Sequence, residues 1–308
     1  MRIVFMGTPE FAVPSLEGLV GAGHQLAGVF SQPDRPVGRH HNKLQPTPVK
    51  ERALVHGIPV YQPETLRDGT ALAILQELDP ELIVVAAYGR FLPDEILALP
   101  SKGCINVHSS LLPKYRGSAP INWAILNGER VTGVTIQRMV RDMDAGDVIL
   151  QQAVKIGKTE DAAALYDRLA QLGGELAVEA VAQIQAGTAT YTPQDHTQAT
   201  QAPMLSKAMS PVDWTRSAQE IFNQIRGLYP WPGASTTVIT GEPIKLWGAQ
   251  VVEKHTDALP GTVIAADWGG IDVACGEFNH VLRILELQAP GKKRMTVAAY
   301  LAGNPIQV

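Results

Sequence analysis

Residues 1–31 read MRIVFMGTPEFAVPSLEGLVGAGHQLAGVFS, and their pattern sets the class of fold. The apolar run at 2–7 is typical of a buried strand, and Pro9 suits the first turn of a following helix. The glycines at 21–23 suit the end of that helix, and a second apolar run follows at 25–31. A strand, a helix and a second strand in this order predict a parallel sheet with crossover helices.

The same alternation continues through the first two thirds of the chain. Further apolar runs at 82–88, 103–108 and 132–154 indicate strands, and an Ala-, Leu- and Glu-rich stretch at about 160–186 indicates a helix. We therefore expect an α/β fold with a Rossmann-like, open and mostly parallel sheet. The pattern breaks between 31 and 52, where four prolines and no clear period predict a long loop of the kind that usually has a function.

The C-terminal part has a different pattern. Residues 187–204 are rich in Thr, Gln and Ala, which is typical of a linker. One short amphipathic helix at about 215–227 and several short strands follow, and these predict a small antiparallel, OB-like β-barrel. The expected division is an α/β domain at 1–187, a linker at 188–205 and a barrel domain at 206–308.

Composition excludes several classes of protein. The chain has 308 residues, of which 45% are hydrophobic and 18% charged, as in ordinary globular proteins. Two cysteines cannot supply a disulfide framework or a cysteine-based zinc finger. The longest stretch without charged residues, 18–33, is too short and too interrupted for a membrane span, and the N-terminus lacks a signal-peptide pattern. We expect a cytoplasmic monomer that does not bind membranes.

The net charge of −4 argues against broad nucleic-acid binding, but two local clusters of bases stand out. The cations are Arg35, Arg39, Lys43 and Lys50 in the first cluster and Lys292, Lys293 and Arg294 in the second. Each cluster is consistent with a solvated loop or with a site for an anionic partner.

Familiar nucleotide and metal motifs are incomplete. The glycines at 21–23 would need a third glycine where Leu26 stands to match a dinucleotide-binding fingerprint. Asp142, Asp144 and Asp147 do not form a calcium loop, because Gly146 occupies a position that requires Asp or Asn. We expect no metal.

The most informative segment is GCINVHSSLLPKYRGSAPINWAI at 103–125. If its first six residues form a strand, Asn106 and His108 project from the same face. Their place near the carboxyl end of the strand is where ligands bind in open α/β sheets. A half-buried histidine beside a strand-end amide, without a role in chemistry, explains the pair equally well.

The residues that follow favour a ligand site. Ser110, Leu111, Leu112 and Pro113 combine backbone hydrogen-bonding groups with an apolar wall that suits a flat heterocycle. Further along, Asp144 lies in a glycine-containing turn, from which it could orient an imidazole or accept a proton.

INVHSSLLPKYRGSAPI with the later DAGD resembles the folate-dependent formyltransferases. The resemblance covers nearly the whole chain and includes FMGTPEFAVPSLEGL, VFSQPDRPVGR, PTPVK, AAYGRFLP, LSKAMSPVDW and YPWPGA. It is strongest to members that act on tRNA. It implies transfer of the formyl group of 10-formyltetrahydrofolate to the α-amino group of methionine on initiator tRNA, with the barrel as the tRNA-binding domain.

The resemblance also assigns roles to residues. It implies catalysis by Asn106, His108 and Asp144; folate binding by Ser110, Leu111, Leu112, Pro113, Arg90, Phe91 and Leu92; and acceptor binding by Phe11, Arg39, Lys43, Lys292, Lys293 and Arg294. Phe11 fits the methionine pocket and the start of a helical core equally well. The chain reads GRHHNK where GRGKK is familiar in the family, which lowers the charge of this loop at neutral pH.

The sequence is consistent with three alternatives to this function. The first is formyl transfer to an amino sugar or to glycinamide ribonucleotide, which would not need the basic 35–50 insertion. The second is hydrolysis of formyl-folate, with water as the acceptor. The third is a non-catalytic RNA-binding protein, which would have no use for an oxyanion donor beside a base.

Overall fold

The computed structural model describes residues 1–37 and 43–306. This part of the chain forms two compact units. The first comprises Met1–Pro120, Val131–Val154 and Tyr166–Ala202, and the second comprises 121–130, 155–165 and the chain from 203 onward.

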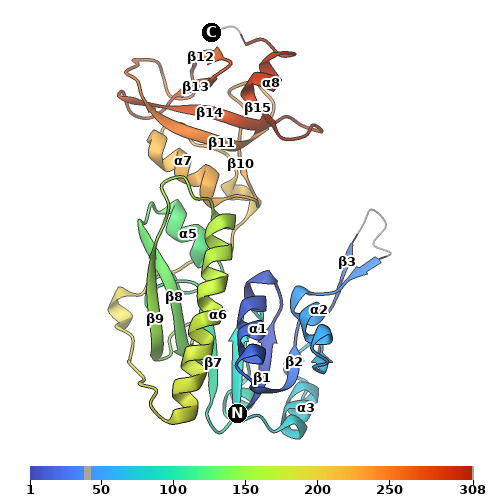
Figure 1. Cartoon of the computed structure of the whole chain (residues 1–308). Helices are drawn as coiled ribbons and strands as arrows, with labels where there is room; N and C mark the ends of the chain where they lie inside the picture. The colour runs from blue at the N-terminus through green and yellow to red at the C-terminus, as the bar shows by residue number, and fades with distance from the viewer. Residues whose placement is uncertain (38–42, 307–308) are drawn as a thin grey trace. The chain divides into compact units, whose positions relative to one another are not determined.

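A seven-stranded sheet forms the centre of the first unit (Figure 1). In spatial order its strands are β5 (Val60–Tyr61), β2 (Gln25–Phe30), β1 (Arg2–Gly7), β6 (Leu82–Ala86), β7 (Cys104–His108), β8 (Val131–Arg138) and β9 (Val148–Lys155). The pairings from β5 to β7 are parallel and β7 pairs with β8 antiparallel, so the predicted mostly parallel sheet is confirmed.

Helices cover both faces of this sheet, which is why its central strands are apolar throughout. The helices of this unit are α1 (Val13–Gly21), α2 (Pro48–Val55), α3 (Thr70–Leu78), α4 (Asp94–Leu97) and most of α6 (Ala162–Ala186). Val4 and Met6 pack in a cluster with side chains of α3 and α4, whereas Ile3 and Phe5 are buried on the other face. Helices α1 and α6 lie side by side (Figure 1), and a Cβ added to Gly174 would lie 2.8 Å from the backbone of Pro14.

The segment predicted as a loop contains regular structure. Strands β3 (Arg35–Val37) and β4 (Lys43–Gln45) pair antiparallel, and Thr47 caps α2 by accepting a hydrogen bond from the Lys50 N–H. The prediction was wrong for these elements because strands of three residues are too short to show an alternating pattern.

The second unit contains an antiparallel sheet, as predicted. Its elements are α5 (Pro120–Leu126), η3 (Lys207–Met209), α7 (Ala218–Gly227), β10 (Ala234–Thr236), β11 (Ile244–Glu253), β12 (Val263–Asp267), β13 (Gly270–Ala274), β14 (His280–Gln288), β15 (Met295–Thr296) and α8 (Val297–Leu301). The strands follow the order β10-β11-β14-β13-β12, with β15 also on β14. Helix α7 begins with a capping box formed by Ser217 and Glu220, and its apolar residues join the core of the sheet.

Residues 188–202 run along the first unit. Thr192 and Val148 exchange both backbone hydrogen bonds, at 2.8 and 2.9 Å, and Arg116 accepts one from the Ala202 N–H at 2.7 Å. A short 3-10 turn, η2 (His196–Gln198), lies between these two points. Within the described ranges, none of the helices combines the length and apolarity that crossing a bilayer requires.

Candidate active site

The strand β7 ends at His108, whose buried imidazole meets two segments that follow it in the chain. Its Nε2 lies 2.9 Å from the Tyr115 carbonyl oxygen. Because a carbonyl only accepts, Nε2 carries a proton in this arrangement. Its Nδ1 lies 3.5 Å from Asp144 Oδ1, with the two side chains 6% and 13% exposed. The imidazole is thus oriented by one backbone carbonyl, and its second nitrogen faces a carboxylate.

Asn106 is half-buried two residues earlier on the same strand. Its neighbours in register are Val85 on β6 and Gln137 on β8. Within residues 1–37 and 43–306, no protein group forms a hydrogen bond with the Asn106 side-chain amide. The sheet therefore holds the backbone of this residue, while its amide N–H groups can donate to a ligand.

Neutral donors hold the Asp144 carboxylate. The Gly117 N–H donates to Oδ2 at 2.9 Å, and the Gln137 amide donates to Oδ1 at 2.9 Å. Asp144 itself has a φ of 52°, in the left-handed region. Asp144 therefore lies beside His108, in the arrangement that the resemblance implied. Sequence reasoning missed Gln137, although its alternation along β8 places it opposite Asn106.

The segment after His108 is folded by hydrogen bonds of its own. The buried Ser110 hydroxyl donates to the Lys114 carbonyl oxygen at 2.7 Å, so it shapes the segment. The Leu112 N–H donates to Thr135 Oγ1 at 3.2 Å, and the Gln151 amide donates to the Leu112 carbonyl oxygen at 2.9 Å. The Leu112 side chain is buried, whereas Leu111 and Pro113 are partly exposed.

The second predicted folate segment follows β6, the neighbour of β7, and so leaves the same edge of the sheet. Arg90 Nε donates to Gln32 Oε1 at 3.0 Å, and its Nη1 donates to the Glu64 carbonyl oxygen. The Phe91 ring is 61% exposed and Leu92 is buried. Phe91 is therefore the member of this segment with the most surface free for a ring-shaped ligand.

Phe11 belongs to η1 (Glu10–Ala12) and is buried against α6. Its ring contacts Tyr166 edge to face, with 5.4 Å between centroids, and its N–H donates to the Tyr166 hydroxyl at 2.8 Å. Burial raises the pKa of Tyr166 to about 12, so the phenol stays protonated at neutral pH. The structure thus gives Phe11 a packing role, and the methionine-pocket role stays a prediction.

The two basic clusters differ in what the structure shows. Arg39 lies outside the described residues, and Lys43 begins β4. Lys50 lies in the first turn of α2, after the hairpin of β3 and β4. Its Nζ donates to Asp34 Oδ2, just before β3, at 2.6 Å and to Gln62 Oε1 at 2.8 Å. Lys50 therefore connects α2 to the residue that precedes the hairpin.

In the second unit, Lys292 and Lys293 are exposed. Arg294 forms an ion pair with Glu286 and lies over the Tyr229 ring at 5.6 Å. The three adjacent cations are thus not equivalent, because an acidic partner already neutralises one of them.

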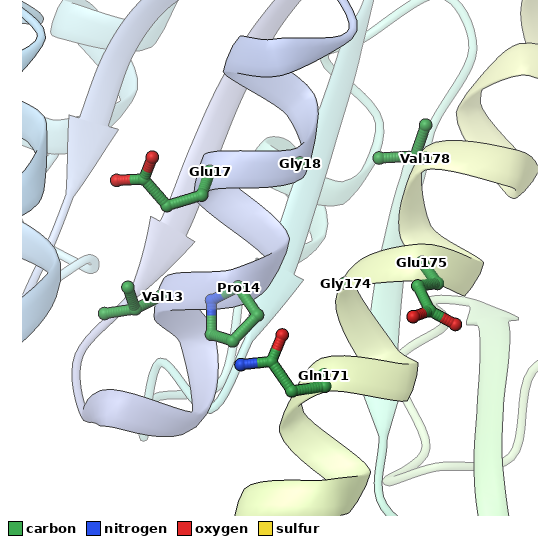
Figure 2. A pocket seen from close by; sticks show the side chains of 8 residues that line it. All are labelled: Val13, Pro14, Glu17, Gly18, Gln171, Gly174, Glu175 and Val178. Atoms are coloured by element: carbon green, nitrogen blue, oxygen red, sulfur yellow. The ribbon is translucent and has the colours of Figure 1, made fainter.

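A groove of about 590 Å³ lies between α1 and α6. Figure 2 shows the side chains that line it. None of the predicted site residues lines it. Its Glu17 accepts a hydrogen bond from Arg52 Nε at 2.6 Å, and this bond lowers the pKa of the Glu17 carboxyl. The groove is thus a separate feature of the helical layer.

Both cysteines are buried and free. Burial raises the pKa of the Cys104 thiol to about 12 and that of Cys275 to about 11. Neither is a thiolate at neutral pH, which excludes them as nucleophiles. Among the described residues, no group of three His, Cys, Asp or Glu side chains is arranged to hold a metal ion.

The sequence matches two family models. Residues 1–181 match "Formyl transferase", and residues 204–305 match "Formyl transferase, C-terminal domain". The chain is 50% identical to the methionyl-tRNA formyltransferase of Alkaliphilus oremlandii, over 100% of this chain and 98% of the relative. It is 47% identical to the methionyl-tRNA formyltransferase of Trichlorobacter lovleyi, over 99% and 95% respectively.

Solved structures show a similar fold. An N-formyltransferase from Helicobacter canadensis, in complex with folinic acid and dTDP-3-aminofucose, matches with a TM-score of 0.70 and 18% identity over 92% of this chain and 99% of its own. HypX from Aquifex aeolicus, in complex with tetrahydrofolic acid, matches with a TM-score of 0.63 and 20% identity over 98% of this chain and 47% of its own. At these identities the likeness concerns the fold alone.

Proposed function

The chain belongs to the formyl transferase family, and we propose that it transfers the formyl group of 10-formyltetrahydrofolate to the α-amino group of methionyl initiator tRNA. The observation that carries the proposal is the likeness, at 47–50% identity and over nearly the full chain, to relatives named for this activity. The arrangement of Asn106, His108 and Asp144 supports it, because amide, imidazole and carboxylate are the groups that formyl transfer to an amine requires.

The reaction forms one bond and breaks another. The amine nitrogen of methionine bonds to the formyl carbon, the bond from that carbon to folate N10 breaks, and one proton moves from the amine to N10. Negative charge develops on the formyl oxygen during attack. The Asn106 amide is the donor for this charge, and the Nε2–H of His108 becomes a second donor when it turns from the Tyr115 carbonyl oxygen to the formyl oxygen. Removing a donor of this kind typically lowers turnover by a factor on the order of 100 or more.

Asp144 orients the imidazole and accepts the proton of the amine, directly or through water. Among the described residues, two neutral donors and the imidazole contact its carboxylate, and no Lys or Arg pairs with it. When the proton reaches folate N10, Asp144 is a carboxylate again and the net charge of the site is unchanged.

The remaining roles are proposed as the resemblance implies them. Residues 110–113 and 90–92 bind folate; Phe11 contributes to the methionine pocket; and Arg39, Lys43, Lys292, Lys293 and Arg294 bind tRNA. The composition of the chain places the catalytic domain at 1–187, the linker at 188–205 and the tRNA-binding domain at 206–308, and residues 188–202 of this linker pack within the first unit. The protein acts as a cytoplasmic monomer.

Labelled 10-formyltetrahydrofolate tests the function with separate acceptors: methionyl initiator tRNA, uncharged initiator tRNA, a nucleotide-linked amino sugar, glycinamide ribonucleotide and water. We expect label only in methionyl-tRNA. Faster labelling of the amino sugar or of glycinamide ribonucleotide would replace the acceptor and keep the family, whereas label released as formate at the same rate without acceptor would identify a hydrolase.

A further inference from the structure

A buried glutamine from the segment between the two family matches contacts the turn that carries Asp144. Gln194 is 7% exposed, although it lies in a stretch whose composition is typical of a linker. The segment is fixed on both sides of it, by the backbone pair of Thr192 with Val148 and by that of Ala202 with Arg116. Gln194 is therefore an integral part of the first unit.

The Gln194 amide joins two backbone carbonyls of this turn. Its Nε2 donates to the Asp144 carbonyl oxygen at 2.9 Å and to the Gly146 carbonyl oxygen at 2.7 Å. Its Oε1 accepts from Arg116 Nη2 at 2.7 Å. Because a guanidinium only donates, Arg116 fixes which end of the amide faces the turn.

The turn needs such support. Asp144 has a left-handed backbone, a conformation that Asp tolerates better than most residues with a side chain but that its surroundings must still hold. A Cβ added to Gly146 would lie only 1.7 Å from the Arg138 carbonyl oxygen, so the turn is also pressed against β8. Without Gln194, one buried and one partly buried carbonyl would lose their donors, and the backbone that aims Asp144 at His108 would be free to relax.

We propose that Gln194 is a positioning residue of the active site, which holds the Asp144 turn so that the carboxylate stays within reach of His108. The proposal rests on the proposed function, since it gives Asp144 its role in formyl transfer. Gln194 acts from a segment that neither family match covers. Arg116 has the accessory task of orienting the amide.

If the role of Gln194 were purely structural, the expected turnover of Gln194→Glu would be different. If Gln194 only anchors its segment through Arg116, Gln194→Glu keeps the size, strengthens the contact with the guanidinium and leaves turnover unchanged. If Gln194 holds the turn, the same variant places a carboxylate oxygen against two carbonyl oxygens. It then repels the turn, and its ion pair with Arg116 offsets part of the lost stability.

The experiment compares Gln194→Glu and Gln194→Ala with Gln201→Glu and Gln201→Ala, matched changes at an exposed position of the same segment. We expect Gln194→Glu to remain folded at the assay temperature, because Arg116 pairs with the new carboxylate, and to lose roughly 10- to 100-fold in kcat, the range for a misplaced catalytic group. KM for 10-formyltetrahydrofolate should stay unchanged. Turnover of Gln194→Glu equal to that of Gln201→Glu would overturn the proposal, even if Gln194→Ala fails to fold.

A double variant provides a second test. In an Asp144→Asn background, Gln194→Glu should lower kcat little further, because the group that it positions is already disabled. Losses that multiply would show that Gln194 acts independently of Asp144 and would also overturn the proposal. An inactive parent protein would instead contradict the proposed function, so the two failures are distinguishable.

Discussion

Asp144 in the first unit and Asp272 in the second are both largely withdrawn from water, with side chains 13% and 1% exposed. Neutral groups hold Asp144, namely a backbone N–H and the Gln137 amide. Asp272 accepts from two cations: Arg283 at 2.6 and 2.9 Å, and Lys254 at 2.9 Å. The two carboxylates share residue type and burial, and they differ in the charge of their partners.

This difference separates a reactive carboxylate from a structural one. Burial alone opposes ionisation of Asp272, but the hydrogen bonds from Arg283 and Lys254 outweigh it and lower the pKa of this carboxyl. Fixed cations make such a group a poor proton acceptor. The charge of Asp144 is not neutralised in this way, so it remains available to an imidazole and a substrate. We expect substitutions around Asp272 to change stability and substitutions around Asp144 to change turnover.

The largest expected effect is on stability. Arg283→Met keeps the aliphatic stem but leaves the Asp272 carboxylate buried with Lys254 as its only cation. Removing one partner of a buried pair typically costs about 3–5 kcal/mol. Because Arg283 is 29% exposed and Lys254 still pairs with Asp272, we expect a loss at the lower end of this range in the free energy of unfolding by urea. Turnover of the folded protein should stay unchanged. A loss below about 1 kcal/mol, the usual value of an exposed ion pair, would contradict the comparison.

Turnover provides the complementary prediction. Asn106→Ala, His108→Ala and Asp144→Asn should each lower the rate of formyl transfer by a factor on the order of 100 or more. Asn106→Ala should leave the free energy of unfolding nearly unchanged, because its amide has no partner among the described residues. His108→Ala and Asp144→Asn each remove at least one hydrogen bond and should lower the free energy of unfolding by about 1–3 kcal/mol. Single-turnover assays with labelled 10-formyltetrahydrofolate measure the rates, and Asp142→Asn in the same turn is the control. Near-parent rates for the first three variants would remove these residues from the mechanism.

Local patterns predicted the strands and half of the site. Apolar runs located β1, β2, β6 and β7, because helices cover both faces of the sheet and leave no polar face. Alternation along β7 placed Asn106 and His108 on one side. The pairing of His108 with Asp144 came from the family resemblance, since nothing local to either residue indicates that they meet.

Contacts between distant segments were the part that could not be predicted. Gln194 lies 50 residues from Asp144 in the chain, in a stretch whose composition suggests a linker. Asp272 reads as the outward residue of an alternating strand, yet it is buried because it pairs in register with Arg283 on β14. In both cases the partner that defines the role is specified by tertiary structure.

At acid pH we expect a smaller effect, on the stability that the ionised Asp272 carboxylate contributes. Because the pKa of Asp272 is lowered on folding, its contribution is fully present above the unfolded value of about 3.9 and is lost as pH falls through the folded value. The stability advantage of the parent over Asp272→Asn should therefore shrink below about pH 4. Urea unfolding between pH 3 and 7 measures it, with the exposed Asp257→Asn as control. A constant advantage across this range would show that ionisation of Asp272 does not stabilise the fold.

The smallest expected effect extends the same reasoning to the basic cluster at 292–294. Each phosphate that Lys or Arg neutralises contributes about 0.9 to the slope of log K against log salt concentration for a duplex. Lys292 and Lys293 are exposed, so Lys292→Ala and Lys293→Ala should each flatten the slope of tRNA binding by close to that amount.

Arg294 should contribute less than either lysine. Glu286 already pairs with its guanidinium, and burial of the group, which disfavours its charge, is outweighed by this partner, so that the pKa of Arg294 is raised. A guanidinium that exchanges one anion for another releases fewer counterions. Filter binding at several salt concentrations should therefore give a flatter slope for Lys292→Ala than for Arg294→Ala. Equal slopes for the three variants would show that phosphate displaces Glu286, and slopes identical to the parent would place the cluster outside the tRNA contact.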